Sequence, residues 1–191
     1  MSQRDDLLAG ARKCLIEKGY SATTARDIVA ASGGAHLGSI GYHFGSKDAL
    51  MNTAVMDAAS EWGDTVEAAV RSATDDETAD QRFETLITAL LAAIPEDRPL
   101  LIASIQAFAQ AQFDPAMREK LAAGYGEART AFASMLLGQT PDSVDDAAVR
   151  GLGSAIYAMV TGYIVQAMID PDSMPDAQDV VAGIRMLMPS D

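Results

Sequence analysis

Two adjacent glycines, Gly33 and Gly34, separate two short stretches of helical pattern, and they constrain the fold more than any other feature of the sequence. Glycine adopts positive φ angles readily, so this pair permits a tight turn between two helices. Before the turn, Thr24 and Asp27 have the spacing of a helix N-cap and its capping box. After the turn, a short helix is predicted over about 36–44. Helix, short turn and helix together form the helix-turn-helix unit.

The rest of the sequence also has helical patterns, and no stretch alternates with the period of two that marks a strand. Gly, Pro and Asp-rich segments separate the patterns. The expected helices cover about residues 4–18, 24–32, 36–44, 47–72, 79–94, 100–112, 116–137, 143–169 and 176–188. We therefore predict an all-α protein of nine helices, with a three-helix module at 1–46 and a helical body at 47–191.

Composition limits the class of protein further. A chain of 191 residues that is 49% hydrophobic can bury a good core. One cysteine, Cys14, excludes an internal disulfide, and with only two histidines no structural zinc site is expected. The apolar stretches, such as 155–160, look too short to span a bilayer, and the N-terminus lacks the pattern of a signal peptide. We expect a soluble, cytoplasmic protein without a membrane partner.

Charge is distributed unevenly along the chain. The net charge of -13 argues against a nucleic-acid partner for the protein as a whole. However, residues 1–50 hold six basic and five acidic residues, a net +1, and the remaining eight basic and 22 acidic residues give 51–191 a net -14. Only the N-terminal module is therefore expected to approach DNA.

The stretch GSIGYHFGSK, residues 38–47, combines glycines with aromatic and basic residues and indicates contact with phosphate. A nucleotide-binding loop needs two glycines separated by four residues, then Lys and Ser or Thr, between a strand and a helix. Here three residues separate Gly41 from Gly45, Ser46 precedes Lys47, and the pattern before them is helical. No catalytic constellation is recognisable either, so neither an enzyme nor a cofactor is expected.

A helix in the major groove makes better use of these residue types. Ile40 and Phe44, four residues apart, form its buried side. Lys47 in the first turn of the next helix opposes the helix dipole, so it suits a DNA phosphate, although a solvated surface lysine is an equal alternative. The residues left for the outer side or its flanks are His36, Ser39, Gly41, Tyr42 and His43.

Over roughly residues 4–54 the sequence resembles the DNA-binding module of the TetR/AcrR family of bacterial transcriptional regulators. The motifs in register are Gly19-Tyr20, Thr23-Thr24, Asp27-Ile28, the glycine turn, Gly38-Ser39, Tyr42-His43-Phe44 and Ser46-Lys47. The resemblance implies that Thr24 and Lys47 hold the DNA backbone and that Tyr42 and His43 contact phosphate or sugar. It also implies that Ala35, His36, Leu37 and Ser39 face base edges. His36 and Gly41 depart from the residues usual in the family, which affects the base contacts.

A stripe of small residues in the segment 143–169 allows close approach of another helix. Packing within the chain would explain it equally well, but the resemblance implies a homodimer interface, which would suit a palindromic operator. The residues assigned to this interface are Gly151, Ser154, Ala155, Ala158 and Gly162.

Polar residues at helical spacing among apolar ones are candidates for the lining of an effector pocket. They are Gln106 and Gln110 in one helix and Tyr125 and Arg129 in another, with surface exposure as the alternative. Trp62, Phe83 and Met159 are further candidates, for which plain core packing is the simpler interpretation. We expect a small, largely apolar effector with one or two polar groups, and Arg129 could pair with a carboxylate.

The resulting hypothesis is a DNA-binding transcriptional regulator, a repressor that a small-molecule effector releases from its operator. The alternatives are an activator, and a helical small-molecule-binding dimer that has lost DNA recognition.

Overall fold

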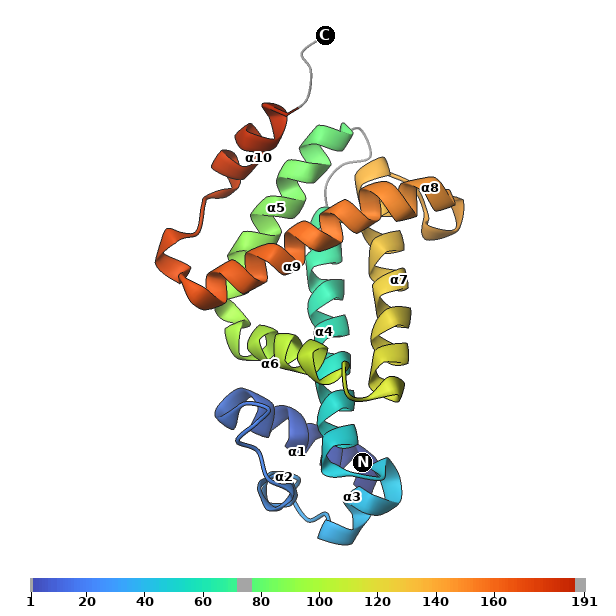
Figure 1. Cartoon of the computed structure of the whole chain (residues 1–191), viewed down its shortest axis with the longest axis vertical. Coiled ribbons are helices and arrows are strands. Elements are labelled where there is room, and N and C mark those ends of the chain that lie inside the picture. The colour runs from blue at the N-terminus through green and yellow to red at the C-terminus, as the bar shows by residue number, and fades with distance from the viewer. Residues whose placement is uncertain (1, 72–76, 188–191) are drawn as a thin grey trace. The chain divides into compact units, whose positions relative to one another are not determined.

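The computed structural model describes residues 2–71 and 77–187, except for the side chains of residues 69, 71 and 110. Within these residues every regular element is a helix (Figure 1). The α-helices are α1 (Gln3–Lys18), α2 (Ala25–Ala31), α3 (Leu37–Phe44), α4 (Lys47–Arg71), α5 (Ala79–Glu96), α6 (Arg98–Gln110), α7 (Pro115–Leu137), α8 (Asp146–Ala148), α9 (Ser154–Ile169) and α10 (Ala177–Arg185).

The all-α prediction is confirmed, and each predicted helix has a counterpart. The predicted helix at 143–169 is a run of three pieces, in which the π-helical turn η2 (Val149–Gly153) joins α8 to α9. Short 3-10 turns, η1 (Pro141–Ser143) and η3 (Pro171–Ser173), lie on either side. The predicted ends at residues 72 and 188 lie outside the described residues.

The chain divides into two compact units. Unit 1 contains Met1–Trp62 and Arg98–Leu121, and unit 2 contains Gly63–Asp97 and Ala122–Asp191. The predicted boundary between residues 46 and 47 divides the chain by function and stays a prediction.

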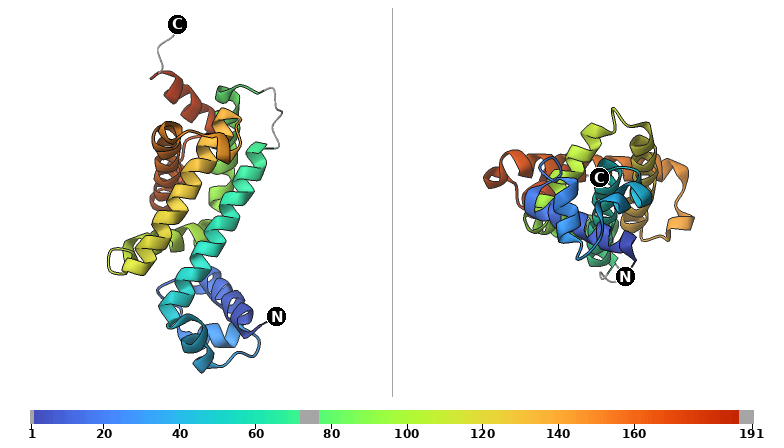
Figure 2. Two further views of the ribbon diagram at one scale, coloured as in Figure 1. Left: turned by 90° about the vertical axis from the view of Figure 1, so that its right-hand side faces the viewer. Right: turned by 90° about the horizontal axis from the view of Figure 1, so that it is seen from below.

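Unit 1 has a continuous hydrophobic core among α1, α2, α3, the start of α4, and α6. In both views of Figure 2, α1, α2 and α3 gather around the start of α4. Cys14 is buried in this core, as the sequence predicts, and burial raises the pKa of its thiol. The largest fully buried side chains of the core are Leu7, Leu15, Ile28, Leu50 and Met51.

Local capping and glycine turns fix the helices of unit 1. The Thr24 hydroxyl accepts from the backbone N–H of Asp27 at 3.2 Å, and the Asp27 carboxylate accepts from the backbone N–H of Thr24 at 2.9 Å. This is the predicted capping box. Gly33 and Gly34 have φ angles of 70° and 139°, so the turn between α2 and α3 uses the conformational freedom that the sequence indicated.

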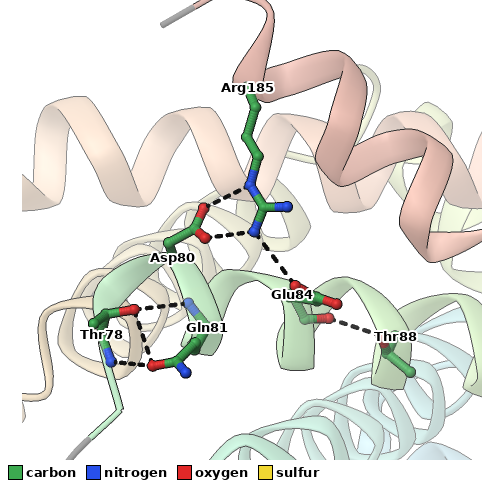
Figure 3. Close-up of polar contacts among 6 residues, drawn as sticks. All are labelled: Thr78, Asp80, Gln81, Glu84, Thr88 and Arg185. Atoms are coloured by element: carbon green, nitrogen blue, oxygen red, sulfur yellow. Dashed lines mark hydrogen bonds and ion pairs between the residues drawn. The ribbon is translucent and has the colours of Figure 1, made fainter. Parts of the chain in front are cut away.

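In unit 2, α10 packs against α5 through a hydrophobic cluster centred on Ile87, Val180 and Val181. The guanidinium of Arg185, at the end of α10, forms ion pairs with Asp80 and Glu84 on α5 (Figure 3). This contact lowers the pKa of Asp80 and raises the pKa of Arg185. Packing and ion pairs together hold the last described helix on α5.

The helical run Asp146–Ile169 corrects the expectation that no apolar stretch is long enough to span a bilayer. It has 24 residues and a mean hydropathy of 1.5 over its most apolar window, of which 22% is buried in the single chain. By length and composition it could cross a membrane, although a helix from the core of a soluble protein passes the same test. Most residues of this window are only partly buried within the chain.

Candidate nucleic-acid interface

Helix α3 presents one face to the core of unit 1 and the other to solvent. Ile40 is buried and Phe44 packs partly against the core, as predicted. On the outer side, the side chain of Leu37 is 52% exposed and that of Tyr42 is 86% exposed. Large apolar side chains in such exposed positions are typical of a binding surface.

Most of the predicted DNA-binding residues lie on this exposed side or beside it. Gly41 is exposed and His43 is half-buried, with its ring 4.8 Å from that of Tyr42. His36 is the exposed N-cap residue of α3 and makes no side-chain capping bond, as expected for a histidine in place of a better cap. Thr24 is exposed at the start of α2. The geometry leaves these side chains accessible to a partner.

The structure corrects the role predicted for Ala35. Its side chain is only 6% exposed and belongs to the hydrophobic core of unit 1. The turn before α3 directs this methyl group inward, so the predicted contact between the Ala35 side chain and a base edge is withdrawn.

Lys47, at the start of α4, has partners that the sequence did not indicate. Its ammonium donates to the carbonyl oxygen of Thr23 at 3.3 Å, pairs with Asp48 at 3.0 Å and lies 6.0 Å from the centroid of the Tyr20 ring. The preceding Ser46 hydroxyl accepts from the backbone N–H of Ala49 at 3.0 Å and so caps the start of α4. Lys47 is thus tied to the loop before α2 rather than freely solvated.

Three polar residues of α1 and α2 were not among the predicted DNA-binding residues. Gln3 accepts a hydrogen bond from Ser39, and Arg4 lies 5.3 Å from the centroid of the Phe44 ring. Arg26, in the first turn of α2, is exposed and has no ion pair or side-chain hydrogen bond within the described part of the chain. For Arg26 the signal was its place two residues after the Thr24 cap, whereas the contacts of Gln3 depend on the tertiary fold.

Among the predicted effector residues in unit 2, Tyr125 and Arg129 lie near Tyr157, which no sequence pattern indicated. The rings of Tyr125 and Tyr157 are 4.8 Å apart. Burial raises the pKa of both phenols, and the positive charge of Arg129 opposes that shift. Nε of Arg129 is buried without a hydrogen-bond partner. This arrangement could receive an acceptor group of a ligand.

The remaining candidates for the effector site are either buried polar groups without a hydrogen-bond partner or side chains packed in a hydrophobic cluster. Within unit 1, Nε1 of Trp62 and Oε1 of Gln106 are buried and have no hydrogen-bond partner. Within unit 2, Phe83 and Met159 pack against the cluster between α5 and α10, the core role that the sequence also allowed. The side chain of Gln110 lies outside the described residues.

A cavity of about 330 Å³ lies in unit 1, and its lining includes none of the predicted effector residues. Burial, followed by the charges of Asp48 and Asp114, raises the pKa of Tyr20 in this lining to about 12. The lining residues are Tyr20, Ser21, Asp48, Asn52, Phe113 and Asp114. In the described residues, no three His, Cys, Asp or Glu side chains gather in a way that could hold a metal ion.

The predicted dimer residues lie along one exposed strip of η2 and α9. Gly151, Ala155 and Ala158 are exposed, and Ser154 and Gly162 are half-buried. Gly153, which was not selected, faces the other way: a Cβ atom there would lie 2.2 Å from the carbonyl oxygen of Arg129. Gly153 thus packs inside unit 2, whereas Gly151, Ala155 and Ala158 leave this side of the helical run exposed within the described chain.

Comparison with known proteins places both parts of the chain. Residues 7–54 match the family model described as bacterial regulatory proteins, tetR family. Residues 79–184 match the model of the C-terminal part of the BetI-type transcriptional repressor. Together the two models cover most of the sequence.

Individual relatives agree with these matches. The HTH-type transcriptional repressor AcnR of Corynebacterium efficiens is 35% identical over 66 residues, which is 35% of this chain and 35% of that protein, so the match spans about a third of its length. A putative transcriptional regulator from Rhodococcus sp. RHA1 has a TM-score of 0.76 at 21% identity, covering 99% of this chain and 97% of its own. The multidrug binding protein EbrR, complexed with imidazole, has a TM-score of 0.72 at 22% identity, covering 99% and 91%.

Proposed function

The chain belongs to the tetR family of bacterial regulatory proteins and is a DNA-binding transcriptional regulator, and we propose that it acts as a repressor that a small-molecule effector releases from a palindromic operator. The observation that carries the proposal is the outer side of α3, where Leu37 and Tyr42 are exposed on a helix fixed by a buried Ile40. A rigid helix with an accessible outer side can enter the major groove.

On the DNA side, the proposal assigns base contacts to His36, Leu37 and Ser39, and close approach of the backbone to Gly41. Contacts with the sugar-phosphate backbone fall to Thr24, Tyr42, His43 and Lys47. Such contacts position the protein, whereas base contacts specify the sequence. Two of the three donors of the Lys47 ammonium have partners at Thr23 and Asp48, and a phosphate would occupy the third.

On the effector side, the support comes from buried polar atoms without hydrogen-bond partners. Such atoms destabilise a protein unless a ligand or water satisfies them. Trp62 offers a donor, Gln106 an acceptor and Arg129 a donor. A largely apolar effector with a polar group matched to such an atom, bound within either unit, would satisfy it. EbrR, the multidrug binding protein of the same fold, was crystallised with imidazole and with proflavin.

The proposal includes a homodimer. Two observations support the homodimer. Small residues of η2 and α9 are exposed, and only 22% of the most apolar window of the run Asp146–Ile169 is buried within the single chain. A two-fold dimer presents two α3 helices to two half-sites of a palindrome. An effector that binds better to a dimer with a different spacing of these helices would release the DNA by shifting the populations of the two states. We place this regulator in the cytoplasm, without catalytic activity or a membrane partner.

The test starts from the full-length protein and random-sequence duplex DNA. Repeated selection should yield a palindromic sequence, whose binding is then compared with scrambled DNA across a series of salt concentrations. Compounds that raise the melting temperature are then screened for release of the operator. Failure to select any sequence would contradict the proposed operator binding and favour the alternative of a helical small-molecule-binding dimer that has lost DNA recognition. A specific complex that effectors strengthen rather than release would contradict the repressor model.

A further inference from the structure

The hydroxyl of Ser39 on α3 donates a hydrogen bond to Oε1 of Gln3, the first residue of α1, at 2.8 Å. Two other contacts hold the first turn of α1 in place. Ser2 caps the helix through a complete capping box. The guanidinium of Arg4 lies 5.3 Å from the centroid of the Phe44 ring, at the far end of α3. Gln3 is therefore held beside the side of α3 that faces bases in the proposed complex.

This hydrogen bond fixes what Ser39 offers to DNA. A serine hydroxyl has one O–H donor and two acceptor lone pairs. Since the proton is directed at Gln3, the lone pairs remain available. In the major groove, the amino groups of adenine (N6) and cytosine (N4) donate, whereas guanine O6 and thymine O4 accept. A hydroxyl held in this way is complementary to adenine or cytosine, and it places an acceptor against an acceptor when it meets guanine O6 or thymine O4.

We propose that Gln3 is a positioning residue for operator specificity. By holding the Ser39 hydroxyl as an acceptor, it makes the protein prefer an amino-bearing base, adenine or cytosine, at the position that Ser39 contacts. The inference rests on the proposed function, because it requires α3 to enter the major groove with Ser39 toward the bases. Gln3 acts through Ser39 and need not touch the DNA itself.

The experiment uses the full-length protein and the operator selected from random-sequence DNA. The variant Ser39→Ala first identifies the base position at which preference depends on Ser39. All four bases are then compared at that position with the wild type, Gln3→Ala and Gln3→Glu. The matched control is Gln112→Ala, which removes another exposed glutamine from unit 1.

We expect Gln3→Ala to reduce the preference for adenine or cytosine by about 3- to 10-fold, the effect of one neutral hydrogen bond, because the freed hydroxyl can then donate to guanine or thymine. Gln3→Glu should keep the preference, since its carboxylate still accepts the proton, while its negative charge weakens binding to every sequence. Gln112→Ala should change neither. A merely structural role for Gln3 would weaken all operator variants together and leave the preference unchanged.

The outcomes separate this inference from the proposed function. If the wild type selects no sequence, the proposed function fails. If a specific operator is found but Ser39→Ala affects no single position, or Gln3→Ala keeps the wild-type preference, the positioning role is overturned. The same holds if Gln3→Glu loses the preference as completely as Gln3→Ala does.

Discussion

At the scale of single residues, replacing Gly41 is expected to change stability and DNA binding in opposite directions. A Cβ atom at Gly41 would meet no other heavy atom within 4 Å, so packing does not require glycine there. We expect Gly41→Ala to raise the free energy of unfolding by about 0.5–1 kcal/mol, because alanine favours the helix. The same variant should weaken operator binding, because the added methyl group would prevent the backbone of α3 from approaching the DNA groove as closely. Urea denaturation and titration with operator DNA measure the two effects. The control Gly126→Ala, in exposed and open space on α7, should stabilise without altering DNA binding.

Gly153 presents the opposite case. A Cβ atom there would lie 2.2 Å from the carbonyl oxygen of Arg129, a backbone atom that cannot move without shifting α7. Gly153→Ala should therefore lower the free energy of unfolding by about 1–3 kcal/mol, as overpacking does elsewhere. Urea denaturation followed by circular dichroism measures the change. Gly124→Ala is the control, because a Cβ atom at this position of α7 would meet nothing within 4 Å, and its free energy of unfolding should be unchanged or slightly raised. Equal losses in both variants would contradict the role given to the contact with Arg129.

Residue by residue, the sequence predicted capping and burial better than it predicted partners. The spacing of Thr24 and Asp27 identified a capping box that the structure contains, because a cap depends only on neighbours three residues away. Ala35 was misplaced and Lys47 was left undecided, because the direction of each side chain depends on how the turn packs against other helices. The bond between Ser39 and Gln3 joins residues 36 positions apart, and no local pattern encodes it.

At the scale of helices, the contact between α10 and α5 predicts a dependence on pH. Arg185 lowers the pKa of Asp80 in the folded chain, so the charged carboxylate favours folding. This contribution is complete above the unfolded-state pKa of about 3.9 and is lost as the pH falls through the lower folded-state pKa. Both side chains are about half exposed, so the effect should be small and should decrease with added salt.

The variant Arg185→Gln tests this dependence. We expect a lower urea midpoint than that of the wild type at pH 7, and a smaller difference at pH 3, where Asp80 is increasingly protonated. Arg150→Gln is the control, because its partner Asp146 is almost fully exposed on the same helical run and should contribute little at either pH. A difference for Arg185→Gln that grows on acidification would contradict the role given to Asp80.

Helix positions were read well from the sequence, but their internal geometry was not. Periodicity and punctuation located the helices, although α5 continues through Pro95 to Glu96, two residues beyond the predicted end. The π-helical turn η2 had no signal of its own, since the residues around it continue a helical pattern. Its explanation is tertiary: Gly153 at its end packs against the backbone of Arg129, and π turns often mark such local adjustments.

At the scale of the whole molecule, the compact units differ from the predicted functional division. Ala103, Ala107 and Met117 belong to the same core as the N-terminal helices, although they lie far along the chain. A pattern in the sequence cannot show such a long-range association. The uneven distribution of charge could be predicted, because the near-neutral residues 1–50 and the acidic remainder follow from composition alone. We expect this asymmetry to keep non-specific DNA binding weak and to favour approach of the DNA to α3.

The proposed homodimer gives the last prediction. Ala158 lies on the exposed strip of α9, where a second copy would pack closely, so Ala158→Arg should place a long charged side chain in that interface and favour the monomer. Sedimentation equilibrium measures the association, and operator binding should weaken with it, because two half-sites are then no longer bound by one linked dimer. Ala123→Arg is the matched control, since it adds the same side chain at an exposed position of α7 outside the strip. If Ala158→Arg associates as the wild type does, this strip is not the dimer interface. If both variants lose association equally, added charge rather than position is responsible.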